Sequence, residues 1–134
     1  MNNTRFATVI HILTLMVDND ELLTSEWIAG SIQINPVIVR KELSVLRKAG
    51  FVISHQGKEG GSKLAKNPSE IFLSDLLMSI KSVETLGKKN LHPNPNCSVG
   101  KKINQQLDQL YQEIDQELLK VLKNKTLLDF YKGF

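Results

Sequence analysis

The sequence contains little cysteine and few aromatic residues. Its one cysteine, Cys97, excludes an intrachain disulfide framework, and this composition suits a reducing cytoplasm. Aromatic residues make up 6% of the chain whereas 41% of it is hydrophobic, so a core has to be built mainly from leucine, isoleucine and valine. A chain of 134 residues can form one domain, or one domain with an extension.

The sequence also lacks a long apolar run. No segment approaches the roughly 18 apolar residues of a membrane-spanning helix. The N-terminal segment Met1–Arg5 has none of the charged, apolar and cleavage-site regions of a secretory signal. We therefore expect a cytoplasmic protein with no membrane partner.

Positive charge is concentrated in one short part of the chain. The formal net charge is +3, and residues 1–39 have a net charge of −3. Residues 40–66 hold seven lysines or arginines and two acids, a net charge of +5, and residues 67–134 have a net charge of +1. A localised basic segment is expected where a protein meets a polyanion, although a solvated basic face is at least as common. The distribution favours a nucleic-acid partner only weakly on its own.

Hydrophobic spacing predicts two helices near the N-terminus. Apolar side chains recur every three or four positions over residues 3–17, which is the pattern of a helix with one buried face. After Asp18–Asp20, the hydroxyl of Thr24 or Ser25 can accept hydrogen bonds from free backbone N–H groups. This predicts a short helix over residues 26–31.

A third helix is predicted over residues 36–49. Asn35 is a suitable cap, and Pro36 suits the first helical position because the N–H that proline lacks has no partner there. Gly50 favours the left-handed conformation that ends many helices. Three apolar residues are assigned to the inward face of this helix: Ile38, Leu43 and Leu46.

A β-hairpin is predicted directly after the third helix. The β-prone run 51–54 is followed by a glycine-rich turn, 55–61, and by a returning strand, 62–65. A short extended piece over 69–73 and a helix over 75–84, with Ser74 as its cap, come next.

The last third of the chain is predicted to hold a loop and a long helix. Residues 85–98 contain two prolines and no apolar period, which predicts a loop. The helix is expected over 101–123, and Thr126 can cap a last short helix. The long helix carries an apolar seam made of Ile103, Leu107, Leu110, Ile114, Leu118 and Val121.

This apolar seam predicts a homodimer. The helix could simply pack on its own domain, but a full apolar face after a loop needs a further surface. The identical helix of a partner is the simplest source of that surface, and it gives a two-fold interface. The predicted division is a DNA-binding domain over 1–84, a sensory or linker loop over 85–100, and a dimerisation segment over 101–134.

The order of the elements predicts a winged helix-turn-helix protein, mainly α with a small β-hairpin wing and a long C-terminal dimerisation helix. In such folds the second helix of the motif, here 36–49, enters the major groove, and a two-fold dimer binds a palindromic operator. Val37, Arg40 and Lys41 near its start are expected to meet base edges, and Arg47 and Lys48 to meet phosphates. The predicted contacts to double-stranded DNA are Ser25, Pro36, Val37, Arg40, Lys41, Ser44, Arg47, Lys48, His55, Gln56, Gly57, Lys58 and Lys63.

Residues 43–65 resemble the wing region of a known family. The stretch LSVLRKAGFVISHQGKEGGSKLA is similar to the IscR/NsrR/CymR (Rrf-two) regulators, whose pattern is a "kaG" helix end followed by S-x-RG-x-x-GG-x-x-LA. Residues 71–77 and the long helix from Lys101 also resemble that family. The resemblance implies a homodimeric winged helix-turn-helix repressor or activator of transcription.

The chain departs from the family pattern at two places. Gln56 stands where the family usually has an arginine before the first wing glycine. Cluster-binding members carry three cysteines before the long helix. Cys97 matches only the last of them, with Thr85 and Leu91 near the other two and Gly100 in place of a histidine ligand. An iron–sulfur cluster needs about four ligands, so we expect no cluster and no other cofactor.

Cys97 is a candidate sensor for thiol chemistry. It precedes a helix, and a helix N-terminus together with Lys101 and Lys102 would stabilise its thiolate. An inert or packed thiol is the alternative. His92 lies in the same loop and could form half of a metal site with Cys97. Structural zinc is bound by four ligands, so no metal site is expected.

Three classes of function are compatible with these features. The leading hypothesis is a sequence-specific transcriptional regulator, more often a repressor, that is modulated at Cys97 or by a small effector. A winged-helix module that binds proteins without touching DNA is the alternative. An enzyme is not expected, because no oriented base, oxyanion motif or cofactor fingerprint accompanies the cysteine.

Overall fold

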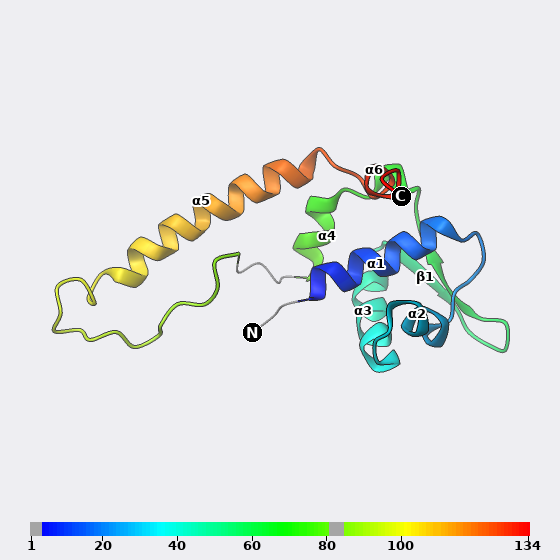
Figure 1. The fold of residues 1–134 in the computed structure, drawn as a ribbon, viewed down its shortest axis with the longest axis horizontal. Helices are drawn as coiled ribbons and strands as arrows, with labels where there is room; N and C mark the ends of the chain where they lie inside the picture. Colours follow the sequence, from blue (N-terminus) through cyan, green and yellow to red (C-terminus); the bar gives the residue numbers. More distant parts are fainter. Residues whose placement is uncertain (1–3, 81–84) are drawn as a thin grey trace.

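A computed structural model describes residues 4–80 and 85–134. The elements follow in the order α1 (Arg5–Asp18), α2 (Ser25–Ile32), α3 (Pro36–Lys48), β1 (Val52–His55), β2 (Gly61–Leu64), the 3-10 helix η1 (Pro68–Glu70), α4 (Leu73–Ile80), α5 (Ile103–Lys123) and α6 (Leu127–Tyr131). The predicted fold class, mainly helical with one antiparallel hairpin and a long C-terminal helix, is confirmed (Figure 1). The hairpin turn and the tip of α5 lie at opposite ends of the molecule (Figure 1).

The predicted caps form at the starts of α2 and α3. The hydroxyl of Thr24 accepts a hydrogen bond from the N–H of Trp27 at 3.1 Å. The side-chain carbonyl of Asn35 accepts one from the N–H of Val37 at 2.9 Å, with Pro36 at the first helical position. Between the two helices Gln33 adopts a left-handed conformation with φ of 64°, which turns the chain sharply. These local contacts fix the helix-turn-helix.

The core lies between α1, α2, α3, α4 and the hairpin, and α6 closes it. The largest fully buried side chains include Ile12, Leu13, Ile28, Leu46, Ile71, Leu76, Ile80 and Leu127. Leu127 belongs to the segment assigned to dimerisation, yet its N–H donates to the carbonyl of Ile71 at 2.8 Å. The last residues of the chain therefore return to the N-terminal core.

Several local expectations were wrong. Ile38 is 47% exposed, and Val39 takes the inward position on α3. Ser74 does not cap a helix, because α4 begins at Leu73. The piece over 69–73 starts as the 3-10 helix η1 and is extended only afterwards. The start of the first predicted helix and the end of the fourth, at residues 3 and 81–84, lie outside the described residues.

The hairpin is fastened to the segment before α2. Leu23 and Ser62 exchange two backbone hydrogen bonds, of 2.9 and 2.8 Å, outside the β1–β2 pairing. Gly61 has a φ of 156°, and a Cβ there would lie 2.8 Å from the carbonyl oxygen of Leu23. The second glycine of the Gly60–Gly61 pair therefore lets the wing approach this backbone closely.

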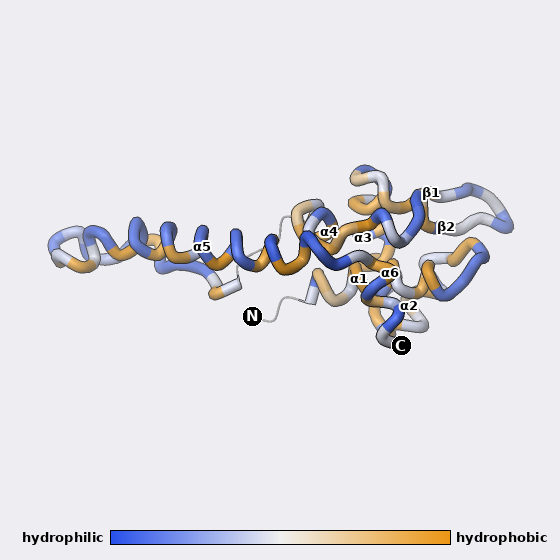
Figure 2. Tube along the Cα trace, turned by 90° about the horizontal axis from the view of Figure 1, so that it is seen from above, coloured by the Kyte–Doolittle hydropathy of each residue, from blue (hydrophilic) through white to orange (hydrophobic). Residues whose placement is uncertain are grey.

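α5 extends away from the core along most of its length. Apolar residues follow one edge of it, as Figure 2 shows. Near its C-terminal end Leu118, Leu119 and Leu122 pack against the core, whereas Leu110 and Val121 remain 45% and 56% exposed. Residues 85–102 run outward from the core beside α5, which begins at the far tip and returns toward the core (Figure 1). Across the described residues, no helix has the combined length and hydropathy needed to cross a membrane.

Candidate nucleic-acid interface

α3 and the hairpin enclose a polar hollow of about 320 Å³. The residues that line it come from the segment before α2 and its first residue, from α3, from both strands and from the hairpin turn. Five predicted DNA contacts lie in it together: Ser25, Arg40, Arg47, His55 and Gln56. Residues that are far apart in the sequence thus share one concave surface next to the recognition helix.

A short hydrogen-bond chain holds Arg47 against the hairpin. Its Nη1 donates to the Oγ of Ser54 at 3.1 Å, and the hydroxyl oxygens of Ser54 and Ser62 lie 2.7 Å apart. Ser62 is buried and also pairs with Leu23 through its backbone. Sequence reasoning missed these serines, although Ser54 lies directly opposite Ser62 in the hairpin register, where side chains on one face meet.

Arg40 projects from the middle of α3 and remains accessible. Its Nη1 lies 3.4 Å from the Oε1 of Glu26 on α2, and the two side chains are 52% and 73% exposed. Exposed pairs of this kind contribute about 0–1 kcal/mol, so a phosphate or base edge can replace the carboxylate. Arg40 lines the hollow, and its ion pair with Glu26 is therefore weak enough for DNA to replace it.

The start of α3 presents apolar side chains outward. Val37 is 59% exposed and Ile38 is 47% exposed. The other predicted contacts are exposed or half-buried on α3 and the hairpin, namely Pro36, Lys41, Ser44, Lys48, Gly57, Lys58 and Lys63. These side chains are accessible, but of the predicted contacts only Ser25, Arg40, Arg47, His55 and Gln56 line the hollow itself.

A buried ion pair fixes α3 from behind. Glu42 is 3% exposed, and its two carboxylate oxygens lie 3.1 and 2.9 Å from the Nε of Arg5. The Nη1 of Arg5 also donates to the carbonyl of Ile80 at 2.8 Å. This pair joins α1, α3 and the end of α4. Sequence reasoning missed it, although an acid between Val39 and Leu46 on an inward stripe calls for a buried partner.

Cys97 lies in an exposed turn before α5. The backbone N–H groups of Gly100 and Val99 hydrogen-bond to its sulfur and lower the pKa of the thiol from its ordinary value. α5 begins only at Ile103, so this turn, and not the expected helix N-terminus, is the main cause. A Cβ at Gly100 would lie 2.6 Å from the carbonyl oxygen of Asn94, which explains why glycine occupies that position.

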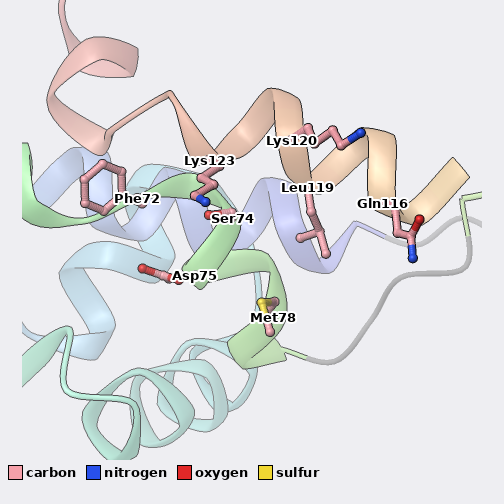
Figure 3. A pocket seen from close by; sticks show the side chains of 8 residues that line it. All are labelled: Phe72, Ser74, Asp75, Met78, Gln116, Leu119, Lys120 and Lys123. Atoms are coloured by element: carbon pink, nitrogen blue, oxygen red, sulfur yellow. The ribbon is translucent and has the colours of Figure 1, made fainter. Parts of the chain in front are cut away.

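A second concave surface lies between α4 and α5. This groove of about 530 Å³ is lined by Phe72, Ser74, Asp75, Met78, Gln116, Leu119, Lys120 and Lys123. Leu119 from α5 and Met78 from α4 point toward it (Figure 3). Met78 is 61% exposed and Phe72 is 39% exposed, so the groove is an accessible apolar surface beside the predicted dimerisation helix.

Comparison with known proteins assigns the family. Residues 2–133 match the model of the Rrf2 family, which is described as an iron-dependent transcriptional regulator. The chain belongs to the Rrf2 family. The predicted resemblance is thereby confirmed. The family and its relatives are transcriptional regulators of the DNA-binding kind, which is a non-enzymatic class.

Two sequence relatives extend over almost the whole chain. YwnA of Bacillus subtilis (strain 168), named as an HTH-type transcriptional regulator, is 40% identical over 129 residues and covers 96% of both chains. The HTH-type transcriptional regulator NsrR of Oceanobacillus iheyensis is 30% identical, over 97% of this chain and 87% of its own. The match to each relative therefore spans most of both chains.

Two solved structures share the fold. A protein described as DNA-binding has a TM-score of 0.73 at 35% identity, over 94% of this chain and 97% of its own. CymR of B. subtilis, described as its global cysteine regulator, has a TM-score of 0.72 at 20% identity, over 100% of this chain and 98% of its own. The winged-helix fold expected for Rrf2 proteins is therefore confirmed.

The iron in the family description does not fit the donor set of this Rrf2 chain. The chain has one cysteine, and thiolates are the usual ligands of iron–sulfur clusters. Over residues 4–80 and 85–134, no group of three or more His, Cys, Asp or Glu side chains is arranged to hold a metal ion.

Proposed function

We propose that this Rrf2 protein binds a specific palindromic operator as a homodimer, with α3 in the major groove and the hairpin following the adjacent backbone. The observation that carries the proposal is the polar hollow that brings Arg40, Arg47, His55 and Gln56 together. Arginine is well suited to both guanine edges and phosphates. A surface that combines both cations beside an exposed recognition helix supports simultaneous contact with a base edge and the backbone.

Selection of bound sequences from a random DNA pool tests this proposal. We expect an enriched inverted repeat whose two half-sites are related by two-fold symmetry, because a two-fold dimer presents two recognition helices. Enrichment of a single unrepeated site would contradict the palindrome. Retention of DNA without any enriched sequence would contradict sequence-specific binding.

The exposed apolar start of α3 predicts contacts with thymine. Val37 and Ile38 have no polar atoms for base edges, and apolar side chains contact the thymine methyl group in the major groove. Burial of a methyl group is worth about 0.8 kcal/mol, so replacing the contacted thymine by uracil is expected to weaken binding about fourfold per half-site. In Val37→Ala or Ile38→Ala, this sensitivity to uracil should fall.

The homodimer is proposed to form through the apolar edge of α5 and the neighbouring groove. Leu110, Val121 and Met78 are exposed there, and the first half of α5 extends beyond the core. A helix of the partner would bury these side chains. An apolar edge that stays exposed to water is unusual in a monomer. Leu118 packs against the core of its own chain and lies where the proposed interface meets that core.

Leu110→Lys is expected to shift the protein from dimer to monomer, because it places a charge in the proposed interface. Sedimentation velocity at several concentrations measures the change. Gln112→Lys is the matched control, since Gln112 is exposed on the same helix two residues away and should leave the dimer intact. Equal sedimentation of Leu110→Lys and the unaltered protein would exclude this edge as the interface.

Thiol chemistry at Cys97 is the proposed regulatory input, with a small effector as the alternative. The exposed sulfur and its lowered pKa support a thiolate that reacts more readily than an ordinary cysteine. Mild peroxide is expected to modify Cys97 and to change operator affinity about fivefold or more, a common size for such coupling. Mass spectrometry and DNA binding are measured in parallel, with Cys97→Ser as the insensitive control. Unchanged affinity at full modification would remove Cys97 from regulation.

Repression is the proposed outcome of operator binding. Occupancy of promoter DNA is sufficient to block transcription, and the proposed interface of α3 and the wing provides that occupancy. The cytoplasm is the proposed location, because the proposed partner is cellular DNA. A reporter gene behind the selected operator should be more active when the protein is deleted, whereas lower activity would indicate an activator.

A further inference from the structure

Aromatic residues gather at the end of the chain. Three of the eight aromatic residues of the sequence lie within residues 130–134. Phe130 is 39% exposed and Phe134 is 84% exposed. The ring centroids of Phe130 and Phe134 are 5.5 Å apart in an edge-to-face arrangement, and those of Tyr131 and Phe134 are 6.5 Å apart. Such an exposed apolar cluster marks an interaction site more often than a bare surface does.

These rings form one wall of a hollow between α6 and α1. The hollow has a volume of about 520 Å³. The opposite wall is the outer face of α1, which contributes the aliphatic side chains of Ile10 and Leu15. Small-molecule sites have volumes of about 300–1,000 Å³ and mainly apolar walls with a few polar groups. The hollow meets both conditions.

Asp18 gives the hollow a negative rim. Among the described residues that line it, Asp18 is the acidic side chain and His11 the basic one, and both are exposed on α1. The hydroxyl of Tyr131 donates to its Oδ1 at 2.7 Å. This hydrogen bond raises the pKa of Tyr131 and places the carboxylate of Asp18 next to the phenol ring.

We propose that this hollow binds a small organic cation that carries an aromatic or branched apolar group. The ring faces attract a cation through their quadrupoles, and the carboxylate of Asp18 adds direct charge complementarity. The aliphatic wall on α1 accommodates the apolar part of the ligand. An anion of the same shape would be repelled by Asp18, and one carboxylate alone cannot hold a metal ion.

The site goes beyond the proposed DNA binding and is independent of it. It lies on α1 and α6, and none of the predicted DNA contacts lines it. α6 follows α5 in the chain and is anchored to the core through Leu127, so a ligand between α1 and α6 would contact the segment that follows the long helix. Binding can be measured on the full chain without DNA.

Three probes with one ring and different head groups test the proposal. These are phenethylammonium, the neutral phenethyl alcohol and the anionic phenylacetate, titrated into the ¹⁵N-labelled full chain and followed by two-dimensional NMR. We expect phenethylammonium to shift amide signals of α1 and α6 and to bind about fivefold more tightly than the alcohol. Phenylacetate should bind more weakly than the alcohol. Equal affinities for all three probes, or no shift at millimolar phenethylammonium, would overturn the proposal.

Two variants locate the cation and the apolar wall. Asp18→Asn keeps an acceptor for Tyr131 but removes the charge, so the affinity for phenethylammonium should fall to that for the alcohol. Phe134→Ala should weaken both. Asp20→Asn and Leu91→Ala are the matched controls, because Asp20 is an exposed acid after the same helix and Leu91 is 78% exposed elsewhere. If Phe134→Ala instead abolished self-association in sedimentation, the hollow would be an interface between copies and the ligand proposal would fail.

Discussion

Replacing Arg40 and Arg47 together by alanine is expected to lower the affinity for operator DNA by about a hundredfold to a thousandfold. A well-placed arginine contact is worth about 1–3 kcal/mol of binding free energy, and every 1.4 kcal/mol is a factor of ten. Both side chains line the hollow between α3 and the hairpin, and both are exposed. Fluorescence anisotropy with a labelled operator measures the loss.

The two single variants should separate sequence preference from general affinity for DNA. If Arg40 contacts a base edge, Arg40→Ala should also relax the preferred sequence at one position of each half-site. If Arg47 contacts a phosphate, Arg47→Ala should weaken all sequences about equally and reduce the salt dependence. Lys88→Ala removes an exposed charge from the loop before α5 and serves as the control. A double variant that binds within twofold of the unaltered protein would exclude the hollow from the interface.

Removing the carboxylate of Glu42 is expected to lower the free energy of unfolding by about 3–5 kcal/mol. Glu42 is almost fully buried and pairs with Arg5, whose side chain is 30% exposed, and removal of the carboxylate breaks a largely buried ion pair and leaves a cavity behind α3. The effect is large because a whole domain is stable by only about 5–15 kcal/mol. Urea denaturation of Glu42→Ala measures the change.

Two further variants distinguish the contribution of the ion pair to stability from that of side-chain packing. The double variant Arg5→Met with Glu42→Leu replaces both charges by apolar groups of similar size, and it should recover much of the lost stability because a matched apolar pair needs no compensation. Glu59→Ala removes an exposed acid from the hairpin turn and should change stability by less than about 0.5 kcal/mol. If Glu42→Ala unfolded at the same urea concentration as Glu59→Ala, the pair would not hold α3 in place.

Local chemistry made much of this fold predictable. Thr24, Asn35 and Gly50 act within a few residues of the helix ends that they define, so their roles follow from hydrogen bonds and backbone conformation alone. The wing follows from glycines around a β-prone run. Candidate DNA contacts could be proposed because the helix-turn-helix order makes α3 the expected recognition helix.

The features that the sequence did not predict depend on distant partners. Glu42 shares the buried face of α3 with Val39 and Leu43, and its carboxylate is paired there with Arg5 on another helix. The backbone pairing of Leu23 with Ser62, and the return of Leu127 to the core, are likewise contacts over long sequence separations. Periodicity within one segment contains no information about such contacts. The inward position of Val39, in contrast, follows from its spacing of four residues to Leu43, which the assignment of Ile38 overlooked.

The salt dependence of operator binding tests the central claim most directly. Anisotropy titrations of the 134-residue chain with the selected operator, and with unrelated genomic fragments, are compared at about 50 and 200 mM salt. If the face of α3 and the wing neutralises several phosphates per half-site, affinity should fall about a thousandfold between the two conditions, while the operator stays preferred. Absence of DNA binding even at the lower salt concentration would contradict the claim and indicate that this winged helix binds proteins instead.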